Sequence, residues 1–225
     1  MYTDLPRRPF RNRRDAGDRL AQRLLGYRDS THVLVLGIPR GGVPVASRVA
    51  EALGAPLDVI VVRKLGVPGI EELAMGAIAS GGVRLLNQEV VRELRVPMAT
   101  INAVAAREAV ELERRERAFR GDRPPIDPAG RTVILVDDGL ATGSSMRAAV
   151  AAVRERGPTR VIAAVPVAPV STCRELEPLV DRLVCVFRVT RFLAVGQWYE
   201  DFTQTSDEEV RSLLGGGDRT AAASR

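Results

Sequence analysis

The sequence predicts an α/β protein with an open, twisted, mainly parallel sheet and helices on both faces. Short, nearly continuous apolar runs rich in β-branched residues recur along the chain, and helical patterns lie between them. Such runs are typical of parallel strands buried on both faces. The alternation of strand and helix favours right-handed crossovers that connect neighbouring parallel strands.

The elements follow in order. A first helix is expected over residues 13–25, where Ala16, Leu20 and Leu24 recur at helical spacing and Gly26 ends the pattern. Buried strands are expected at residues 32–36, 57–62, 132–136, 160–165 and 183–187. Helices are expected at residues 43–53, 87–120, 144–156 and 171–179.

The segment between the second and third strands is too long for a simple crossover. Residues 73–78 and 83–86 predict a β-hairpin, and residues 100–120 predict a charged helix whose interleaved acids and arginines are typical of a solvated face. We therefore expect one domain over residues 1–225. It would comprise a core at about 28–190, an enlarged flexible-loop and helical insertion at about 63–130, and a small C-terminal hood at about 190–205 joined by the N-terminal arm. Residues 1–9 and 215–225 are expected to be loose.

The charge of the chain is unevenly placed. Of 225 residues, 45% are apolar and 27% charged, which excludes a disordered or collagen-like chain. The net charge of +5 suggests a nucleic-acid partner, but the first 28 residues hold eight arginines and three acids and so account for the whole excess. We therefore do not expect nucleic-acid binding.

Cysteine and histidine are too scarce for several chemistries. Cys173, Cys185 and His32 are the whole supply, so neither a structural zinc site nor a Ser-His-Asp triad is expected. The apolar surroundings of both cysteines predict buried free thiols in a reducing cytoplasm. No run of 18 apolar residues exists, and the arginine-rich N-terminus has no apolar segment behind it. We expect no membrane span, no secretory signal and a cytoplasmic location.

The most informative stretch is V-I-L-V-D-D-G-L-A-T-G-S-S at residues 133–145. It predicts a buried strand, two carboxylates at its end, and a loop of small residues that opens a helix. Glycines, hydroxyls and a helix N-terminus together make a phosphate cradle. Two acids beside a phosphate suit neutral hydroxyl partners, such as those of a sugar that carries the phosphate. The stretch matches neither the Walker A loop nor the dinucleotide fingerprint.

Two further features point to an anion. Residues 37–42, Gly-Ile-Pro-Arg-Gly-Gly, follow the first strand; their glycines let backbone approach an anion, and the Arg40 fork can bind it. An ordinary turn is the alternative. Lys64 is the single lysine among 33 basic residues. A compact ammonium suits pyrophosphate, whereas chance codon usage is the alternative.

Residues 133–145 resemble the phosphoribosyl-pyrophosphate (PRPP) signature of the type I phosphoribosyltransferases, and residues 140–143 are most similar to the adenine and uracil members. The order of strands and helices over about residues 30–200 also fits that family. The resemblance implies that Asp137 and Asp138 hold the ribose 2- and 3-hydroxyls. It also implies that the loop wraps the 5-phosphate, through Gly139, Leu140, Ala141, Thr142, Gly143, Ser144 and Ser145.

The same resemblance implies the rest of the site. Pyrophosphate would be bound by Pro39, Arg40, Gly41, Gly42 and Lys64, in a loop where a non-proline cis peptide is common. Lys64 and Asp138 would be the catalytic residues. Mg²⁺ would be the cofactor, held mainly through PRPP with no direct protein ligand, and a homodimer is the expected assembly. Ala141 replaces an acid of the 6-oxopurine enzymes, which disfavours hypoxanthine and guanine.

The base would meet the hood. Residues 191–202, R-F-L-A-V-G-Q-W-Y-E-D-F, are similar to the hood of purine-type members, with one extra residue before the acid. Phe192, Trp198, Tyr199 and Asp201 are the candidate base contacts, with packing of the aromatics against the sheet edge as the alternative. The insertion would take the place of a loop that closes over the reaction and excludes water. Glu71 and Glu72 are acid/base candidates there, or solvated charges.

These observations predict a Mg²⁺-dependent phosphoribosyltransferase that acts on a nucleobase or related nitrogen heterocycle and releases pyrophosphate. The sequence does not choose among adenine, uracil, xanthine or another heterocycle. A non-catalytic PRPP-binding or nucleotide-binding regulator on the same fold is the alternative, in which the basic N-terminal arm would contact nucleic acid. A hydrolase of ribose phosphates is a third possibility.

Overall fold

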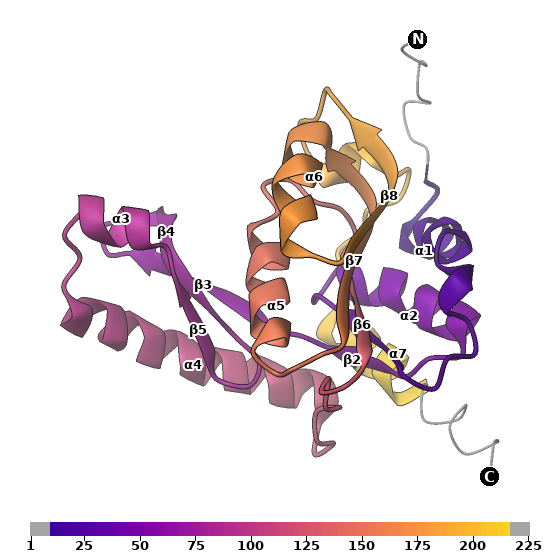
Figure 1. Ribbon diagram of the computed structural model, residues 1–225, viewed down its shortest axis with the longest axis horizontal. Coiled ribbons are helices and arrows are strands. Elements are labelled where there is room, and N and C mark those ends of the chain that lie inside the picture. The colour runs from indigo at the N-terminus through magenta and orange to yellow at the C-terminus, as the bar shows by residue number, and fades with distance from the viewer. Residues whose placement is uncertain (1–9, 217–225) are drawn as a thin grey trace.

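The computed structural model describes residues 10–216 and is built around two sheets (Figure 1). The main sheet has five parallel strands in the order β2-β1-β6-β7-β8. They are β1 (Val33–Gly37), β2 (Leu57–Val59), β6 (Thr132–Val136), β7 (Arg160–Pro169) and β8 (Arg182–Val189). The predicted open parallel sheet is confirmed.

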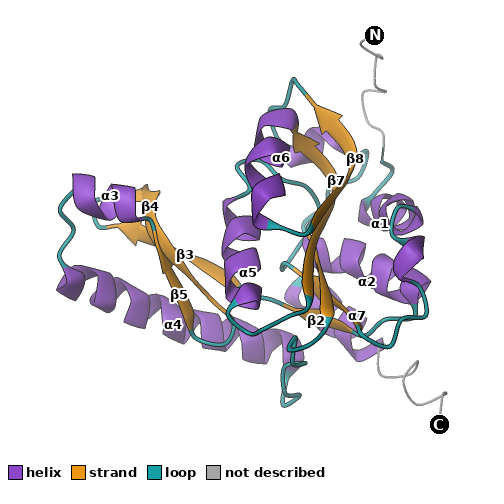
Figure 2. Cartoon of the chain, in the orientation of Figure 1, coloured by secondary structure: helices purple, strands orange, loops and turns teal. Residues whose placement is uncertain are grey.

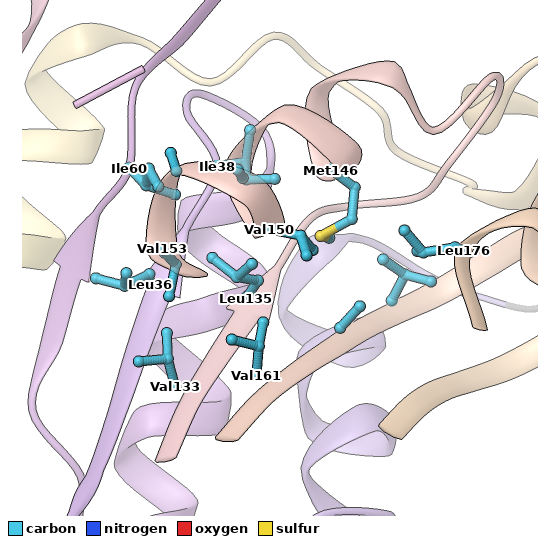
Figure 3. Close-up of a cluster of buried hydrophobic side chains, with 14 of the residues drawn as sticks. Leu36, Ile38, Ile60, Val133, Leu135, Met146, Val150, Val153, Val161 and Leu176 are labelled. Carbon is cyan, nitrogen blue, oxygen red and sulfur yellow. The ribbon is translucent and has the colours of Figure 1, made fainter. Parts of the chain in front are cut away.

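Helices cover both faces of this sheet (Figure 2). They are α1 (Arg13–Gln22) and α2 (Gly42–Leu53) on one face, and α5 (Ser144–Arg154) and α6 (Val170–Leu176) on the other. The strand residues alternate between the two cores: Val133 and Leu135 pack against α5, whereas Ile134 and Val136 pack against α1 and α2. Figure 3 shows the α5 side, where Met146, Val150 and Val153 lie over the strands.

The expected strand at residues 57–62 is wrong in one respect, because the apolar run belongs to two sheets. β2 ends at Val59, and β3 (Val62–Val67) begins a second, antiparallel sheet with β4 (Ile70–Ala79) and β5 (Val83–Leu86). Ser80 makes the transition, since its hydroxyl accepts from Val61 N at 2.8 Å and its own N–H donates to Val61 O at 2.9 Å. The predicted hairpin is therefore part of a three-stranded sheet.

This second sheet packs on helices that were only partly predicted from the sequence. The helix expected over residues 87–120 is two helices, α3 (Gln88–Glu93) and α4 (Met98–Arg120), because Pro97 stands at the N-cap of α4 and Arg95 adopts a φ of 49°. A helix α7 (Asp207–Gly216), which was not predicted, buries Val210 and Leu214 against the same core as α4. We call β3–β5 with α3 and α4 the arm; it extends away from the main sheet in Figure 1.

The N-terminal segment and the hood, residues 190–205, lie together. Phe10 forms a parallel bridge with Tyr199, Phe10 N donates to Trp198 O at 3.1 Å, and Glu200 N donates to Phe10 O at 2.8 Å. Short 3₁₀ turns complete the chain at η1 (Leu25–Tyr27), η2 (Glu177–Leu179) and η3 (Val195–Trp198). Of the ends expected to be loose, residues 1–9 and 217–225 lie outside the described residues, whereas residues 215 and 216 belong to the last turn of α7.

Two other expectations concern composition. Both cysteines are free thiols; Cys173 is buried in α6 and Cys185 is half-buried in β8. Within residues 10–216, no helix has the length and apolarity needed to cross a membrane.

Candidate active site

The candidate site lies where the connections of the main sheet change direction. From β1 the chain continues to β2 on one side, whereas β6, β7 and β8 follow one another on the other side. β1 and β6 are neighbours, so the loops after them leave the same edge of the sheet side by side. Crevices at such switch points, outside the carboxyl ends of the strands, are where open α/β sheets bind ligands.

Glycine allows these two loops to touch. A Cβ atom built on Gly41 would collide with Asp138 Oδ2, and one on Gly42 would lie 2.7 Å from Val136 O. Ile38 N donates to Val136 O at 2.8 Å, and the peptide bond between Pro39 and Arg40 is cis. The pyrophosphate-loop candidate, residues 39–42, therefore packs directly on the acidic pair.

The acidic pair is held in an unfavourable environment for negative charge. Burial, followed by the charge of Asp138, raises the pKa of Asp137 well above its ordinary value. Burial also raises the pKa of Asp138, although Arg13 opposes that shift. Asp137 Oδ1 accepts from Asp138 N at 2.9 Å. Two partly compensated carboxylates at a ligand-binding edge are typical of functional sites.

Arg13 supplies the compensating charge. Its Nε donates to Asp138 Oδ2 at 2.8 Å, and the two side chains are only 11% and 14% exposed. This residue was not predicted from the sequence, because it is one of 32 arginines and lies 125 positions from its partner. No local signal distinguishes it.

The loop after the acids has unused hydrogen-bond donors. Among residues 10–216, nothing accepts from the N–H groups of Ala141, Thr142 or Gly143. Gly143 has a φ of 70°, a left-handed conformation that suits glycine, and α5 begins directly after it. The hydroxyls of Thr142 and Ser144 are 3.1 Å apart at this helix start. Free N–H groups, hydroxyls and a helix N-terminus together can bind a phosphate.

Contacts behind this loop hold its shape. Leu140 N donates to Val167 O at 2.9 Å, and the buried Thr172 hydroxyl donates to Ala141 O at 2.7 Å. A Cβ on Gly139 would lie 2.6 Å from Val195 Cγ1, so the loop also packs tightly on the hood. Thr172 was not predicted as a site residue.

Arg40 and Lys64 are placed differently. Arg40 Nη1 lies 3.3 Å from Asp207 Oδ1 at the start of α7, and both side chains are more than a third exposed. Lys64 was expected to follow a strand. It lies instead within β3 and is exposed. Val62 packs with the α5 core and Leu65 packs with the α4 core, so alternation places Lys64 on the α5 side of the arm. Its ammonium makes no ion pair with any described residue.

The hood candidates separate into packed and accessible residues. Tyr199 is 2% exposed, its ring lies 5.3 Å from Phe10 and 5.0 Å from Phe202, and its hydroxyl donates to Asp138 O at 2.5 Å. Trp198 is buried, and its Nε1 has no hydrogen-bond partner among the described residues. Phe192 is half-buried. In this structure Tyr199 packs the hood and has no open ring face.

The remaining acids lie apart from the reacting edge or are otherwise engaged. Asp201 Oδ1 accepts from Thr203 N and its hydroxyl, at 2.9 and 2.6 Å. With Arg13 and Thr203 it lines a polar pocket of about 200 Å³. Glu71 and Glu72 stand on β4 near the turn from β3, and Glu71 Oε1 accepts from Gly69 N at 3.1 Å. Hydrogen bonds from the backbone of Glu71 itself and of Gly69 lower the Glu71 pKa, which disfavours a role as proton donor.

Comparison with known proteins identifies the family. The family model described as the phosphoribosyl transferase domain matches residues 69–199, more than half of the chain. This chain belongs to the phosphoribosyl transferase family. The match confirms the resemblance, and it contains the acidic pair and the phosphate loop.

Relatives support this membership. A Mycobacterium tuberculosis protein provisionally named a phosphoribosyl transferase is 48% identical over 205 residues, which cover 91% of this chain and 46% of that protein. The chain thus spans about half the length of that curated relative. A protein named bifunctional protein PyrR from Chloroflexus aurantiacus is 33% identical over 131 residues, covering 57% of this chain and 66% of that protein. The crystal structure of TT1426 from Thermus thermophilus has a TM-score of 0.81 at 42% identity and covers 91% of this chain and 97% of that one.

Proposed function

We propose that this phosphoribosyl transferase family member transfers the 5-phosphoribosyl group of PRPP to a ring nitrogen of a nucleobase or related heterocycle. The bond between the nitrogen and ribose C1 forms as the bond from C1 to the pyrophosphate oxygen breaks. The displaced group leaves as pyrophosphate, and the ring N–H proton passes to solvent or a base.

One observation carries this proposal: the pyrophosphate-loop candidate packs on the acidic pair, with Gly41 beside Asp138 and Gly42 beside Asp137. PRPP has a pyrophosphate next to two ribose hydroxyls. A cationic loop beside paired hydrogen-bond acceptors, with a loop of free donors directly after those acceptors, matches that arrangement of groups.

Each part of the site then has a task. Asp137 and Asp138 would accept hydrogen bonds from the ribose hydroxyls, and the N–H groups of residues 141–143 would donate to the 5-phosphate. Arg40 would bind pyrophosphate in exchange for Asp207; an exposed pair of this kind is worth only about 0–1 kcal/mol, so an anionic ligand can compete for it. Lys64 would approach from the arm. Stabilisation of charge on the leaving group would supply most of the catalysis.

Mg²⁺ fits these residues as an ion that arrives with the substrate. Mg²⁺ is commonly bound through one or two carboxylates and substrate phosphates, and it keeps several waters. Across residues 10–216, no group of three or more His, Cys, Asp or Glu could hold a metal ion, whereas the two carboxylates of the acidic pair stand beside the place proposed for pyrophosphate. When bound, the ion would offset charge on the pyrophosphate oxygens.

A screen of acceptors against PRPP and Mg²⁺, measured by pyrophosphate release, tests the proposal. We expect release that depends on one heterocycle and that falls by about 10²-fold or more in the Asp138→Asn variant. The matched control is Asp122→Asn, an exposed acid just after the end of α4 and outside the site. PRPP binding without turnover for any acceptor would favour a regulatory protein, and PRPP loss without an acceptor would favour a hydrolase. Either result would overturn the transfer reaction.

A further inference from the structure

Arg13 is the one side chain that joins the N-terminal helix, the acidic pair and the hood among the described residues. It is the first residue of α1, and Asn12 caps that helix by accepting from Asp15 N at 3.0 Å. The cap sets where the helix begins, and therefore where Arg13 points.

Three contacts hold the guanidinium. Nε donates to Asp138 Oδ2 at 2.8 Å, Nη1 donates to Thr203 O at 2.7 Å, and the group lies 3.9 Å from the centre of the Phe202 ring. A planar fork can make two directed hydrogen bonds while its face stacks on a ring, which a lysine ammonium cannot do. The geometry therefore uses properties of arginine and not its charge alone.

Asp138 has little other support for its charged form. Asp137 faces it on the same loop, the Tyr199 hydroxyl donates to its backbone oxygen, and the Gly41 backbone closes a third side. Asp201 in the hood accepts hydrogen bonds from Thr203. These bonds, followed by the charge of Arg13, lower the pKa of Asp201. Arg13 is thus the cation in contact with the pair among the described residues.

We propose that Arg13 is a positioning residue for PRPP binding, which orients the Asp138 carboxylate toward a ribose hydroxyl and keeps it charged. The inference rests on the proposed function, because it assigns the ribose hydroxyls to this pair. It goes beyond that function by making α1 and the hood part of substrate recognition.

The route of this coupling is short. Arg11 O accepts from Asp201 N at 2.9 Å, and Phe10 pairs with residues 198–200, so the backbone that leads into α1 is hydrogen-bonded to the hood at this edge. A displacement of either element would pull the guanidinium away from Asp138. The position of the hood thereby affects how the Asp138 carboxylate is oriented toward a ribose hydroxyl.

Two variants of Arg13 test the proposal, with PRPP binding measured directly by calorimetry in the presence of Mg²⁺. We expect Arg13→Gln to weaken PRPP binding by about 10-fold or more, the scale of one charge-assisted hydrogen bond, and Arg13→Lys to recover part of the loss. Arg23→Gln is the matched control, because Arg23 is at the far end of the same helix, is exposed, and lies outside the pocket that Arg13 lines. Binding by Arg13→Gln that equals the wild type would overturn the proposal.

A pH profile separates positioning from a purely structural role. Loss of the cation should move the acid limb of PRPP binding to higher pH in Arg13→Gln, whereas Arg13→Lys should keep the limb near that of the wild type. Carbon-13 NMR of the Asp138 carboxyl, assigned with Asp138→Asn, gives the same titration without any ligand. An unchanged Asp138 titration in a folded Arg13→Gln protein would overturn the proposal.

The outcomes also distinguish this inference from the proposed function. Wild-type protein that turns over PRPP while Arg13→Gln binds it normally refutes only the role of Arg13. Wild-type protein that binds PRPP without turnover, but loses binding in Arg13→Gln, refutes the transfer reaction and supports the positioning role. If the wild type does not bind PRPP, the proposed function fails and this inference fails with it.

Discussion

At the scale of a single residue, the position of Asp137 disfavours its negative charge and so lowers the stability of the folded protein near pH 7. Asp137 is half-buried and lies beside the Gly42 backbone and Asp138, and no described residue forms an ion pair with it. Burial and like charge both raise its pKa. A chain selected only for stability would not place two acids here.

The Asp137→Asn variant should therefore be more stable than the wild type near pH 7. A raised folded-state pKa means that the acid adds stability below its ordinary pKa, and that this contribution is lost as pH rises through the folded value. The amide keeps an oxygen for Asp138 N without the charge. We expect a gain of about 1 kcal/mol in the free energy of unfolding, the size of a typical single-substitution effect.

Urea unfolding across pH checks this expectation. The gain should shrink as pH falls to the ordinary pKa of aspartic acid and below it, because Asp137 then becomes neutral in the unfolded as well as in the folded wild type. Asp122→Asn should show no comparable trend. Destabilisation of Asp137→Asn at pH 7 would contradict the interpretation.

At the scale of elements, the arm is attached to the main sheet by a buried ion pair as well as by apolar packing. Arg120 at the end of α4 and Asp58 in β2 are each less than 10% exposed and lie 2.8 Å apart. Asp58 also accepts from Ile126 N at 2.9 Å, and Glu116 lies 3.1 Å from Arg120. Within the arm, Arg63 of β3 pairs with Glu108 of α4. The insertion expected as an enlarged loop with a hairpin and a charged helix is thus built from β3–β5, α3 and α4.

Removing one partner of the buried pair should be costly. We expect Arg120→Met to lower the free energy of unfolding by about 3–5 kcal/mol, because Asp58 would remain as an uncompensated buried charge. The double variant with Asp58→Asn should recover part of that loss, and Arg117→Met, on the exposed face of the same helix, should change stability little. Denaturant unfolding measures all three, and a double variant worse than Arg120→Met would contradict this account.

Lys64 belongs to the same scale, because its role depends on β3 and the arm. We expect Lys64→Ala to reduce kcat/KM by about 10²-fold, the usual effect of removing one group that stabilises developing charge. Its effect on stability should stay within about 0.5 kcal/mol, since the side chain is exposed. Lys64→Arg keeps the charge but not the compact ammonium group, so its kcat/KM should lie between those of the wild type and Lys64→Ala. An unchanged kcat/KM for Lys64→Ala would disprove the catalytic role.

At the scale of the whole molecule, the site draws on both ends and the middle of the chain. Arg13 comes from α1, the acidic pair and phosphate loop follow β6, and residues 199–203 come from the hood. One of the N-terminal arginines, Arg13, is thus largely buried and paired with Asp138. Deleting residues 1–14 would remove Arg13 and Phe10, so a test of nucleic-acid binding by the N-terminal segment should delete residues 1–9 alone.

A ligand that contacts all of these regions should stabilise the whole fold. At about 100 times its dissociation constant, a bound ligand adds about 2.7 kcal/mol. For a chain of this size that corresponds to a rise in Tm of about 5–10 °C. We expect PRPP with Mg²⁺ to produce this shift, a chelator to reduce it, and Asp138→Asn to abolish it. A thermal shift that is equal in Asp138→Asn would place PRPP elsewhere.

Several elements follow from local sequence. The apolar runs at β1 and β6 and the small-residue loop before α5 carry their own signals within short contiguous stretches, so both the sheet and the loop that opens α5 were predicted. The break between β2 and β3 was not predicted, because the apolar run continues across it and the Ser80 hydrogen bonds at the break come from a residue 19 positions farther along the chain. Helix α7 was not predicted, because its buried residues Val210 and Leu214 pack on a core formed with the distant helix α4.

The fold class, the pair of acids and the small-residue loop after them could be predicted from local sequence, because each is encoded by contiguous residues whose chemistry is local. The contact of Arg13 with Asp138, the approach of Gly41 and Gly42 to the acids, and the burial of Tyr199 arise only from the packing of distant segments. Asp138 lies 125 positions from Arg13 and 61 from Tyr199 along the chain. The energies of these contacts depend on burial and distance, which no local pattern records.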